Sequence, residues 1–148
     1  MSKMAWATYL LLGVVVAVRP ASGQEVPAPR STILTRSAST ITGQPIPPPA
    51  PGFEVVISRT EIPAGGMLPM HRHPWPRYAI VEQGRLRVRY EEAGLDRVFG
   101  PGEAVIEAIG QWHEGEVVGA EPVRLIVIDH VPPGETNMVR RPERQNMR

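Results

Sequence analysis

The sequence contains no cysteine, so it forms no disulfide and has no thiolate to act as a nucleophile or a metal ligand. Lysine is almost as scarce, because Lys3 is the one example and the other cations are arginines. Aromatic residues make up 5% of the chain, and 16 basic residues nearly balance 15 acidic ones. Because nucleic-acid binding needs a strongly basic surface, we expect no nucleic-acid partner.

Several familiar catalytic signatures are also missing from the sequence. There is no Gly-x-Ser-x-Gly nucleophile elbow, no phosphate-binding Walker loop and no dinucleotide-binding glycine motif. After residue 23, no window of about a dozen residues combines helical periodicity with capping residues. We therefore expect a chain of strands whose chemistry depends on other residue types.

The first 23 residues have the three parts of a secretory signal peptide. Lys3 gives a positive start, residues 4–18 are almost entirely apolar, and residues 21–23 are small. The apolar run is shorter than the roughly 20 residues of a membrane helix. We therefore expect cleavage after Gly23, a periplasmic or secreted protein, and no membrane contact after cleavage.

The rest of the chain predicts an all-β barrel or sandwich. Residues 24–40 form a linker, and residues 31–42 predict one or two edge strands. Five prolines between positions 45 and 51 predict an extended loop. Further strands are expected over residues 54–57, 67–73, 78–82, 86–90, 104–106 and 123–131, the fourth of which alternates Leu86, Val88 and Tyr90 with arginines. The barrel should span residues 41–133, followed by a solvated basic tail over residues 134–148.

His71 and His73 are the strongest candidates for a functional site. Residues i and i+2 of a strand share a face, so the two imidazoles can reach one point. His113 follows a glycine-rich turn about forty residues later and would complete a three-nitrogen metal site. Three imidazoles suit Fe, Mn, Zn, Cu or Ni, so the ligand type does not identify the divalent metal. The alternative is that hydrogen bonds satisfy these histidines at the mouth of the barrel.

Two glycine–histidine patterns frame these residues: Gly65-x5-His71-x-His73-x3-Arg77-x6-Gly84 and Gly102-x5-Ala108-x-Gly110-x2-His113. They resemble the two signatures of the cupin superfamily. The resemblance covers residues 41–131 and implies a cupin-type double-stranded β-helix, or jelly-roll barrel. It also implies metal binding by the three histidines and a homodimer that pairs through edge strands.

Arg77 is the main departure from the family pattern, because cupins normally have a glutamate ligand there. A guanidinium only donates hydrogen bonds and cannot ligate a metal. In one arrangement Arg77 turns aside and holds an anionic substrate group. In a second, Glu82 or Glu107 becomes a fourth ligand, and strand parity favours Glu107, which could also pair with Arg77. In the third, the barrel binds an anionic ligand without metal. The second signature also departs from the family pattern, at Ala108 (usually proline) and Val117 (usually asparagine).

Four neighbouring residues allow a functional or a structural interpretation. Trp75 and Trp112 would either form an aromatic wall over the metal or pack at the barrel rim. Tyr78 should lie on the face opposite Arg77. Asp129 and His130 are consecutive, so a regular strand points them to opposite faces and they cannot form a catalytic dyad.

The sequence leaves two functional hypotheses and one weaker one. The first is an exported small-molecule dioxygenase or related oxidoreductase, with Arg77 anchoring an anionic substrate and Glu107 as general base. Isomerases and decarboxylases share the fold. The second is a barrel that binds a carboxylate or sugar acid without turning it over. A structural or assembly subunit, indicated by the proline-rich arm, is the third.

Overall fold

The computed structural model describes residues 28–142. Residues 28–31 belong to a unit that ends at Ser31, and the unit from Thr32 onward contains every described strand. The expected signal peptide and the start of the linker lie outside the described residues. A search of residues 28–142 finds no helix long and apolar enough to cross a membrane.

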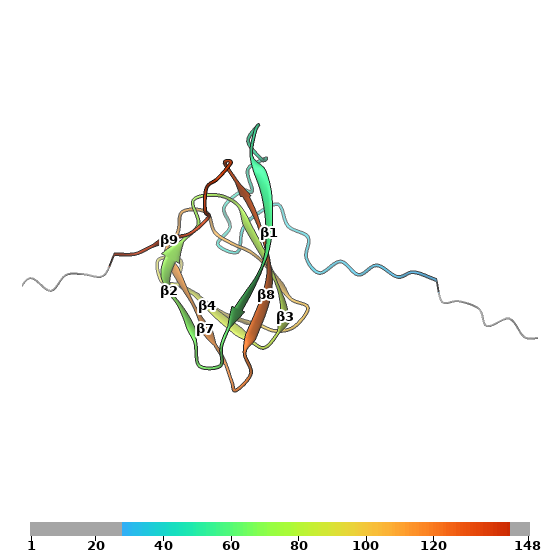
Figure 1. Cartoon of the computed structure of the whole chain (residues 1–148), viewed down its shortest axis with the longest axis vertical. Helices are drawn as coiled ribbons and strands as arrows, with labels where there is room; N and C mark the ends of the chain where they lie inside the picture. Colours follow the sequence, from blue (N-terminus) through green and yellow to red (C-terminus); the bar gives the residue numbers. More distant parts are fainter. Residues whose placement is uncertain (1–27, 143–148) are drawn as a thin grey trace, which may run out of the picture. The chain divides into compact units, whose positions relative to one another are not determined.

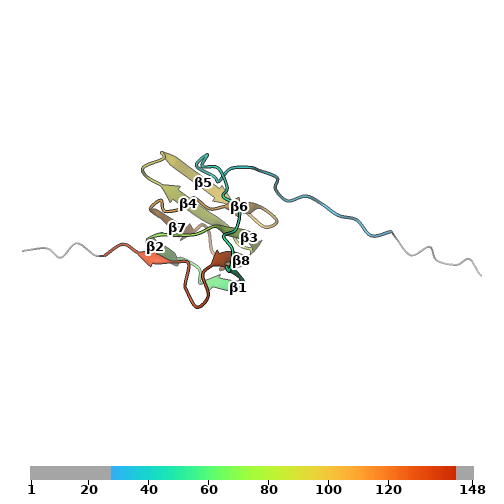
Figure 2. The same ribbon diagram turned by 90° about the horizontal axis from the view of Figure 1, so that it is seen from above.

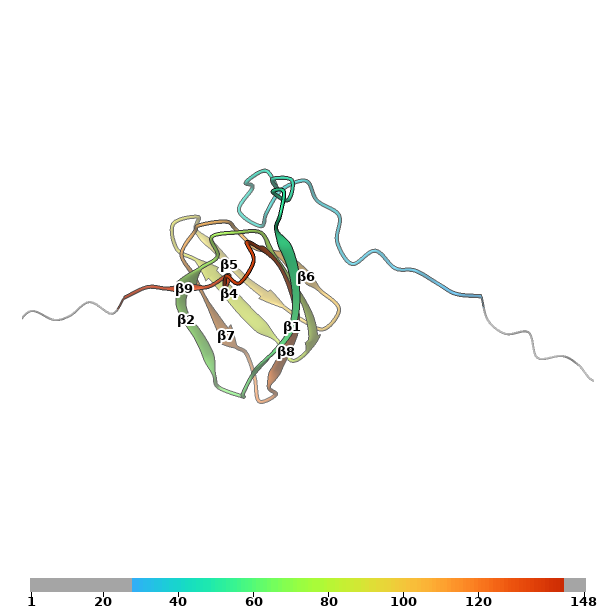
Figure 3. The same cartoon turned by 45° about the horizontal axis from the view of Figure 1, so that its top comes forward.

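The strands between residues 28 and 142 form two antiparallel sheets that enclose a common interior (Figures 1 and 3). The first sheet has the order β1 (Glu54–Ile62), β8 (Val123–Val131), β3 (Arg77–Gln83), β6 (Ala104–Ile106). The second has the order β5 (Leu95–Phe99), β4 (Leu86–Tyr90), β7 (His113–Val117), β2 (Met67–Arg72), β9 (Val139–Arg140). Viewed from above, the sheets lie on either side of the barrel interior (Figure 2). The fold is an all-β jelly roll, as predicted.

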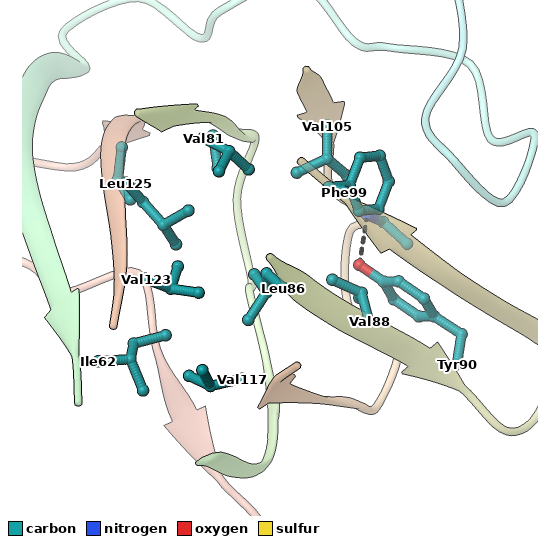
Figure 4. Close-up of a cluster of buried hydrophobic side chains, with 13 residues drawn as sticks. Ile62, Val81, Leu86, Val88, Tyr90, Phe99, Val105, Val117, Val123 and Leu125 are labelled. Atoms are coloured by element: carbon teal, nitrogen blue, oxygen red, sulfur yellow. Dashed lines mark hydrogen bonds between the residues drawn. The ribbon is translucent and has the colours of Figure 1, made fainter. Parts of the chain in front are cut away.

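Alternating strands supply the core between the sheets. In β4 and β8 every second residue is buried, which confirms the inward positions predicted for Leu86, Val88 and Tyr90. These side chains meet residues of the opposite sheet, including Val81 and Leu125 (Figure 4). Burying one such aliphatic side chain contributes about 1.5–3 kcal/mol. Part of this core also lines a cavity that contains polar residues.

Strand boundaries agree best where the hydrophobic pattern is strong. The predicted strands over residues 86–90, 104–106 and 123–131 coincide with β4, β6 and β8. The sequence analysis did not predict β7, because its inward positions are His113, Gly115 and Val117 rather than three apolar side chains. It also did not predict β5 or β9.

The edge strands predicted over residues 31–42 are wrong. The described part of this segment forms no strand: it has an isolated bridge between Ser39 and Pro45, and the Ile41 N–H donates to the Ile106 carbonyl at 2.8 Å. Thr40 instead closes a turn, because its hydroxyl accepts the Gln44 N–H at 3.1 Å and its carbonyl accepts the Gly43 N–H at 2.9 Å. Local hydrogen bonds from serine and threonine side chains compete with strand pairing, and here they prevail.

The basic tail predicted from residue 134 is also wrong over its first part. Asn137 is buried, and β9 pairs with β2 through His71–Arg140 and Arg72–Val139. The Arg141 N–H then donates to the Met70 carbonyl at 2.9 Å. The chain therefore returns to the strand that carries the first histidine.

Gly84 gives a stability test of the turn between β3 and β4. Its φ is +75°, and a Cβ there would collide with the Pro122 carbonyl. Gly94 has φ +62° but open space around its Cα. We expect Gly94→Ala to cost about 1 kcal/mol of unfolding free energy from backbone strain alone, and Gly84→Ala to cost at least about 2 kcal/mol more. Urea denaturation measures both values, and equal losses would contradict the close approach to Pro122.

Candidate metal centre

Strand pairing brings the three histidines together. His71 in β2 lies directly opposite His113 in β7. His73 follows the end of β2 and forms a parallel bridge with Ile109. The ring centroids are 4.2 Å apart for His71 and His113, and 4.9 Å apart for each pair with His73. All three residues are at most 3% exposed, and one ligand nitrogen from each lies within 4.8 Å of the others.

Each of the three rings binds a backbone carbonyl through Nδ1. The distances are 2.7 Å from His71 to Pro69 O, 2.6 Å from His73 to Asn137 O and 3.2 Å from His113 to Gln111 O. A carbonyl oxygen only accepts, so Nδ1 must carry the proton in each ring. Nε2 is therefore the atom that each ring, when neutral, presents as a ligand, as in metal-binding histidines with outer hydrogen-bond partners.

Burial keeps two of these rings neutral. It lowers the pKa of His71 to about 4, with the neighbouring His113 adding to the effect. Burial lowers the pKa of His73 to about 2, and the positive charge of Arg77 acts in the same direction. Nε2 of His71 and Nε2 of His73 are therefore acceptors, and a ring nitrogen of His113 lies within 4.8 Å of the candidate ligand atoms of both. A metal cation supplies the missing positive charge, so the donor set fits a divalent metal.

Glu107 lies beside the histidines, immediately after β6. Its Oε2 is 3.5 Å from Nε2 of His113 and accepts a hydrogen bond from the hydroxyl of Tyr90. The Tyr90 ring stacks on the His113 ring at 4.4 Å, and its oxygen accepts the Ala108 N–H at 3.2 Å. Burial and the Glu107 carboxylate raise the pKa of Tyr90, so the phenol stays a hydrogen-bond donor. Tyr90 holds the carboxylate close to the candidate metal position.

Arg77 pairs with Asp129 across β3 and β8. Its Nε donates to Oδ1 and its Nη2 to Oδ2, each at 2.7 Å. Of the arrangements that the sequence left open, the ion pair of Arg77 with Glu107 is not the one observed, because Asp129 faces Arg77 directly in the strand register. The bidentate pair compensates the guanidinium charge in a poorly solvated position. The role of Arg77 as an anchor for an anionic substrate stays a prediction.

A small cavity extends from the histidines into the barrel. It measures about 40 Å³ and is bounded by the three histidines together with Arg77, Glu107 and Met138, and by aliphatic side chains deeper inside. This volume has room for about three water molecules. The polar groups therefore gather at one end of an otherwise apolar chamber.

The other candidate residues lie outside this cavity. Trp75 packs edge-on against Phe53 at 6.4 Å between ring centroids. Trp112 lies within cation–π distance of the guanidinium groups of Arg72 and Arg141, at 4.8 and 4.9 Å. Both tryptophans therefore pack at the rim.

The remaining candidates lie on the strand faces that the sequence predicted for them. Tyr78 faces outward beside His130, with their ring centroids 5.8 Å apart, whereas Asp129 points inward. Glu82 pairs with Arg59 at 3.1 Å on the surface, away from the histidines. The sequence analysis did not identify Asp129, Asn137 or Tyr90 as parts of the site. Only Tyr90 carried a signal, its inward position in an alternating strand.

Comparisons with known proteins agree with the geometry. A family model described as a cupin domain matches residues 58–129, from within β1 to Asp129 near the end of β8. The chain belongs to the cupin superfamily. No curated protein matches it significantly.

Among solved structures, it resembles the polyketide cyclase RemF from Streptomyces resistomycificus, with 21% identity, a TM-score of 0.52, and coverage of 74% of this chain and 80% of that chain. It also resembles the DMSP lyase DddQ from Ruegeria pomeroyi, with 23% identity, a TM-score of 0.50, and coverage of 66% of this chain and 46% of that chain. For the Cnp3 cupin domain of Schizosaccharomyces pombe the identity is 19%, the TM-score is 0.48, and the coverage is 52% of this chain and 56% of that chain. The chain thus spans about half of the length of DddQ and of the Cnp3 cupin domain. The likenesses to RemF and DddQ show the fold alone.

The low pKa values of His71 and His73 predict how the metal-free protein responds to acid. The unfolded chain takes up these protons near pH 6.5, whereas the folded protein resists protonation down to about pH 4 at His71 and about pH 2 at His73. The two histidines therefore cost the protein no free energy of unfolding well above pH 6.5. As the pH drops below 6.5, the free energy of unfolding falls by about 2 kcal/mol per histidine down to pH 5.

Denaturation in the presence of a chelator, at about pH 7 and about pH 5, measures this loss. The control is His130→Gln, which alters a histidine outside the cavity and should keep the wild-type dependence. In a His71→Gln/His73→Gln variant the pH dependence should largely disappear. If the stability of this double variant fell with pH as steeply as that of the wild type, His71 and His73 would not be the buried neutral rings that cause the loss.

Proposed function

We propose that this cupin binds a single divalent metal ion through Nε2 of His71, His73 and His113. The observation that carries the proposal is the set of three buried imidazoles whose Nδ1 atoms are all occupied by carbonyl oxygens. That arrangement leaves three lone pairs facing one another at ligand-to-ligand distances under 4.8 Å. Three protein ligands leave coordination positions open for water or a small molecule.

Glu107 is the group we assign to proton transfer at this site. A bound divalent metal supplies Lewis acidity there and, if it is Fe, Mn or Cu, redox chemistry as well. Glu107 lies 3.5 Å from a ligand nitrogen, so its carboxylate can take a proton from a molecule held beside the histidines. Tyr90 fixes the carboxylate by donating to Oε2. This arrangement suits a small-molecule dioxygenase or related oxidoreductase.

The position of Arg77 in the lining of the cavity favours a second candidate function, a barrel that binds a carboxylate or sugar acid without turning it over. Nε and Nη2 of Arg77 bind Asp129, so Nη1 is the guanidinium nitrogen left for such a ligand. A cavity of about 40 Å³ also admits only a small ligand without movement of its walls. Loss of the family's glutamate ligand weakens metal chemistry further. Metal loading and oxygen consumption distinguish this candidate from the enzyme.

Metal content is the first test of the proposed function. We expect purified protein, or protein reconstituted with Fe, Mn, Zn, Cu or Ni, to hold about one ion per chain by elemental analysis. A His71→Ala/His113→Ala variant should lose the ion, whereas His130→Ala should retain it. Absence of metal from the wild type after every reconstitution would overturn the metal-binding proposal.

The loaded protein then distinguishes enzyme from binder. Oxygen consumption with a panel of small carboxylic, phenolic and sugar acids should depend on the metal and fall in Glu107→Gln, which keeps the side-chain shape. Stoichiometric metal with no oxygen consumption, and a ligand bound without change, would favour the non-catalytic barrel.

Export and self-association complete the proposal. Export follows from the signal-peptide pattern of residues 1–23. A homodimer is supported by β1, which lies at the edge of its sheet and pairs only with β8 within that sheet. Val55 and Ile57 are 58% and 68% exposed on this strand. A long edge strand with exposed aliphatic side chains is a ready surface for pairing with a second copy.

Substitution on β1 tests the homodimer. Ile57→Arg should shift the protein from dimer to monomer in light scattering after size-exclusion chromatography, because it places a charge in the proposed interface. Met67→Arg is the matched control, since Met67 is 54% exposed on β2 of the other sheet. A monomeric wild type, or an Ile57→Arg protein that remains dimeric, would overturn this use of β1.

A further inference from the structure

The segment after β8 carries one deeply buried polar residue, Asn137, which is 3% exposed. Its side chain forms a closed pair of hydrogen bonds with Trp75: Oδ1 accepts the Trp75 N–H and Nδ2 donates to the Trp75 carbonyl, each at 3.0 Å. These bonds anchor the segment to the loop between His73 and Arg77. Asn137 is therefore a fixed point in the wall of the histidine site.

Asn137 provides the hydrogen-bond acceptor for one metal-ligand candidate. His71 and His113 bind the carbonyls of Pro69 and Gln111, each two residues earlier in the chain. His73 differs, because its Nδ1 donates at 2.6 Å to the Asn137 carbonyl, 64 residues away. The local backbone alone does not set the tautomer and ring orientation of His73. They depend on the position of this distant segment.

Asn137 also acts on the residue that replaces the family's glutamate. Its Nδ2 donates at 2.7 Å to Oδ1 of Asp129, the carboxylate that holds Arg77. Asp129 thus accepts two hydrogen bonds from Arg77 and one from Asn137. A buried carboxylate needs such hydrogen bonds to remain charged and to pair with a guanidinium. Through Asp129, Asn137 helps keep the guanidinium turned onto its counter-ion rather than toward the histidine nitrogens.

We propose that Asn137 is the positioning residue of the metal centre, acting on His73 through its backbone carbonyl and on Arg77 through Asp129. The inference rests on the proposed metal binding and explains how the site accommodates an arginine in the position of an anionic ligand. One residue orients a ligand and restrains a nearby cation. Its position is in turn reinforced by β9, which pairs with β2.

Cobalt binding tests this role, because Co²⁺ is a spectroscopic substitute for Fe, Zn and other divalent ions at histidine sites. We expect Asn137→Ala to weaken Co²⁺ affinity about 10-fold in chelator competition, because alanine keeps the carbonyl but loses the side-chain bonds to Trp75 and Asp129 that fix its position, and a displaced outer hydrogen-bond partner weakens metal binding. At saturating cobalt, its visible absorption bands should differ from those of the wild type. Thr136→Ala is the matched control, since Thr136 is exposed in the same segment and should leave affinity and spectrum unchanged.

A second set of variants separates the two actions of Asn137. Asp129→Asn keeps the side-chain shape but removes the charge that compensates Arg77, so it should also weaken Co²⁺ binding. It provides the test if Asn137→Ala does not fold. Replacing the ion pair by Arg77→Met/Asp129→Leu should remove the part of the Asn137→Ala effect that arises from the guanidinium. The loss of Co²⁺ affinity that remains then arises from the altered position of His73.

The outcomes are distinguishable from those that test the proposed function. A wild type that binds no cobalt overturns metal binding and this inference together. A wild type that binds cobalt, with Asn137→Ala equal to it in affinity and spectrum, overturns the positioning role alone. An Asn137→Ala protein that loses unfolding free energy without cobalt, but keeps the wild-type cobalt spectrum and affinity, assigns Asn137 to stability and also overturns the role.

Discussion

The candidate metal centre depends on one electrostatic constraint, the close approach of three buried imidazole rings, of which burial keeps His71 and His73 uncharged. Each ring donates from Nδ1 to a backbone carbonyl, so Nε2 is the nitrogen left to bind a cation. Such a cluster is unfavourable unless a cation joins it. The surrounding barrel makes the constraint rigid, because His71 and His113 are cross-strand partners between two long-range strands.

The charge balance around the centre departs from the usual cupin pattern at two positions. Where the family normally has a carboxylate, Arg77 supplies a positive charge, and Asp129 on the neighbouring strand cancels it. Negative charge near the histidines comes instead from Glu107, which follows β6 and is held by Tyr90. The carboxylate nearest His113 thus comes from another part of the barrel, and Asp129 compensates the charge of Arg77.

Sequence reasoning reached the features that depend on local periodicity. The i, i+2 spacing of His71 and His73, the alternation in β4 and the parity of Tyr78 all follow from the two-residue repeat of a strand. It did not reach the pairing of Arg77 with Asp129 or the buried position of Asn137. These contacts join residues 52 and 64 positions apart, and their register is set by the packing of whole strands rather than by any local pattern. β7 was missed because His113 and Gly115 occupy two of its three inward positions, which a strand of the core usually fills with apolar side chains.

The hydrogen bond between His73 and Asn137 also sets an order of assembly. As the chain is synthesised, all three histidines are present before residue 137 follows. Until then His73 lacks its acceptor and β2 lacks its outer neighbour, β9. Chains shortened ahead of this segment would carry every ligand and still lack the finished site. The centre is therefore completed by nearly the last described part of the protein, and its integrity reports that the chain has been made and folded to that point.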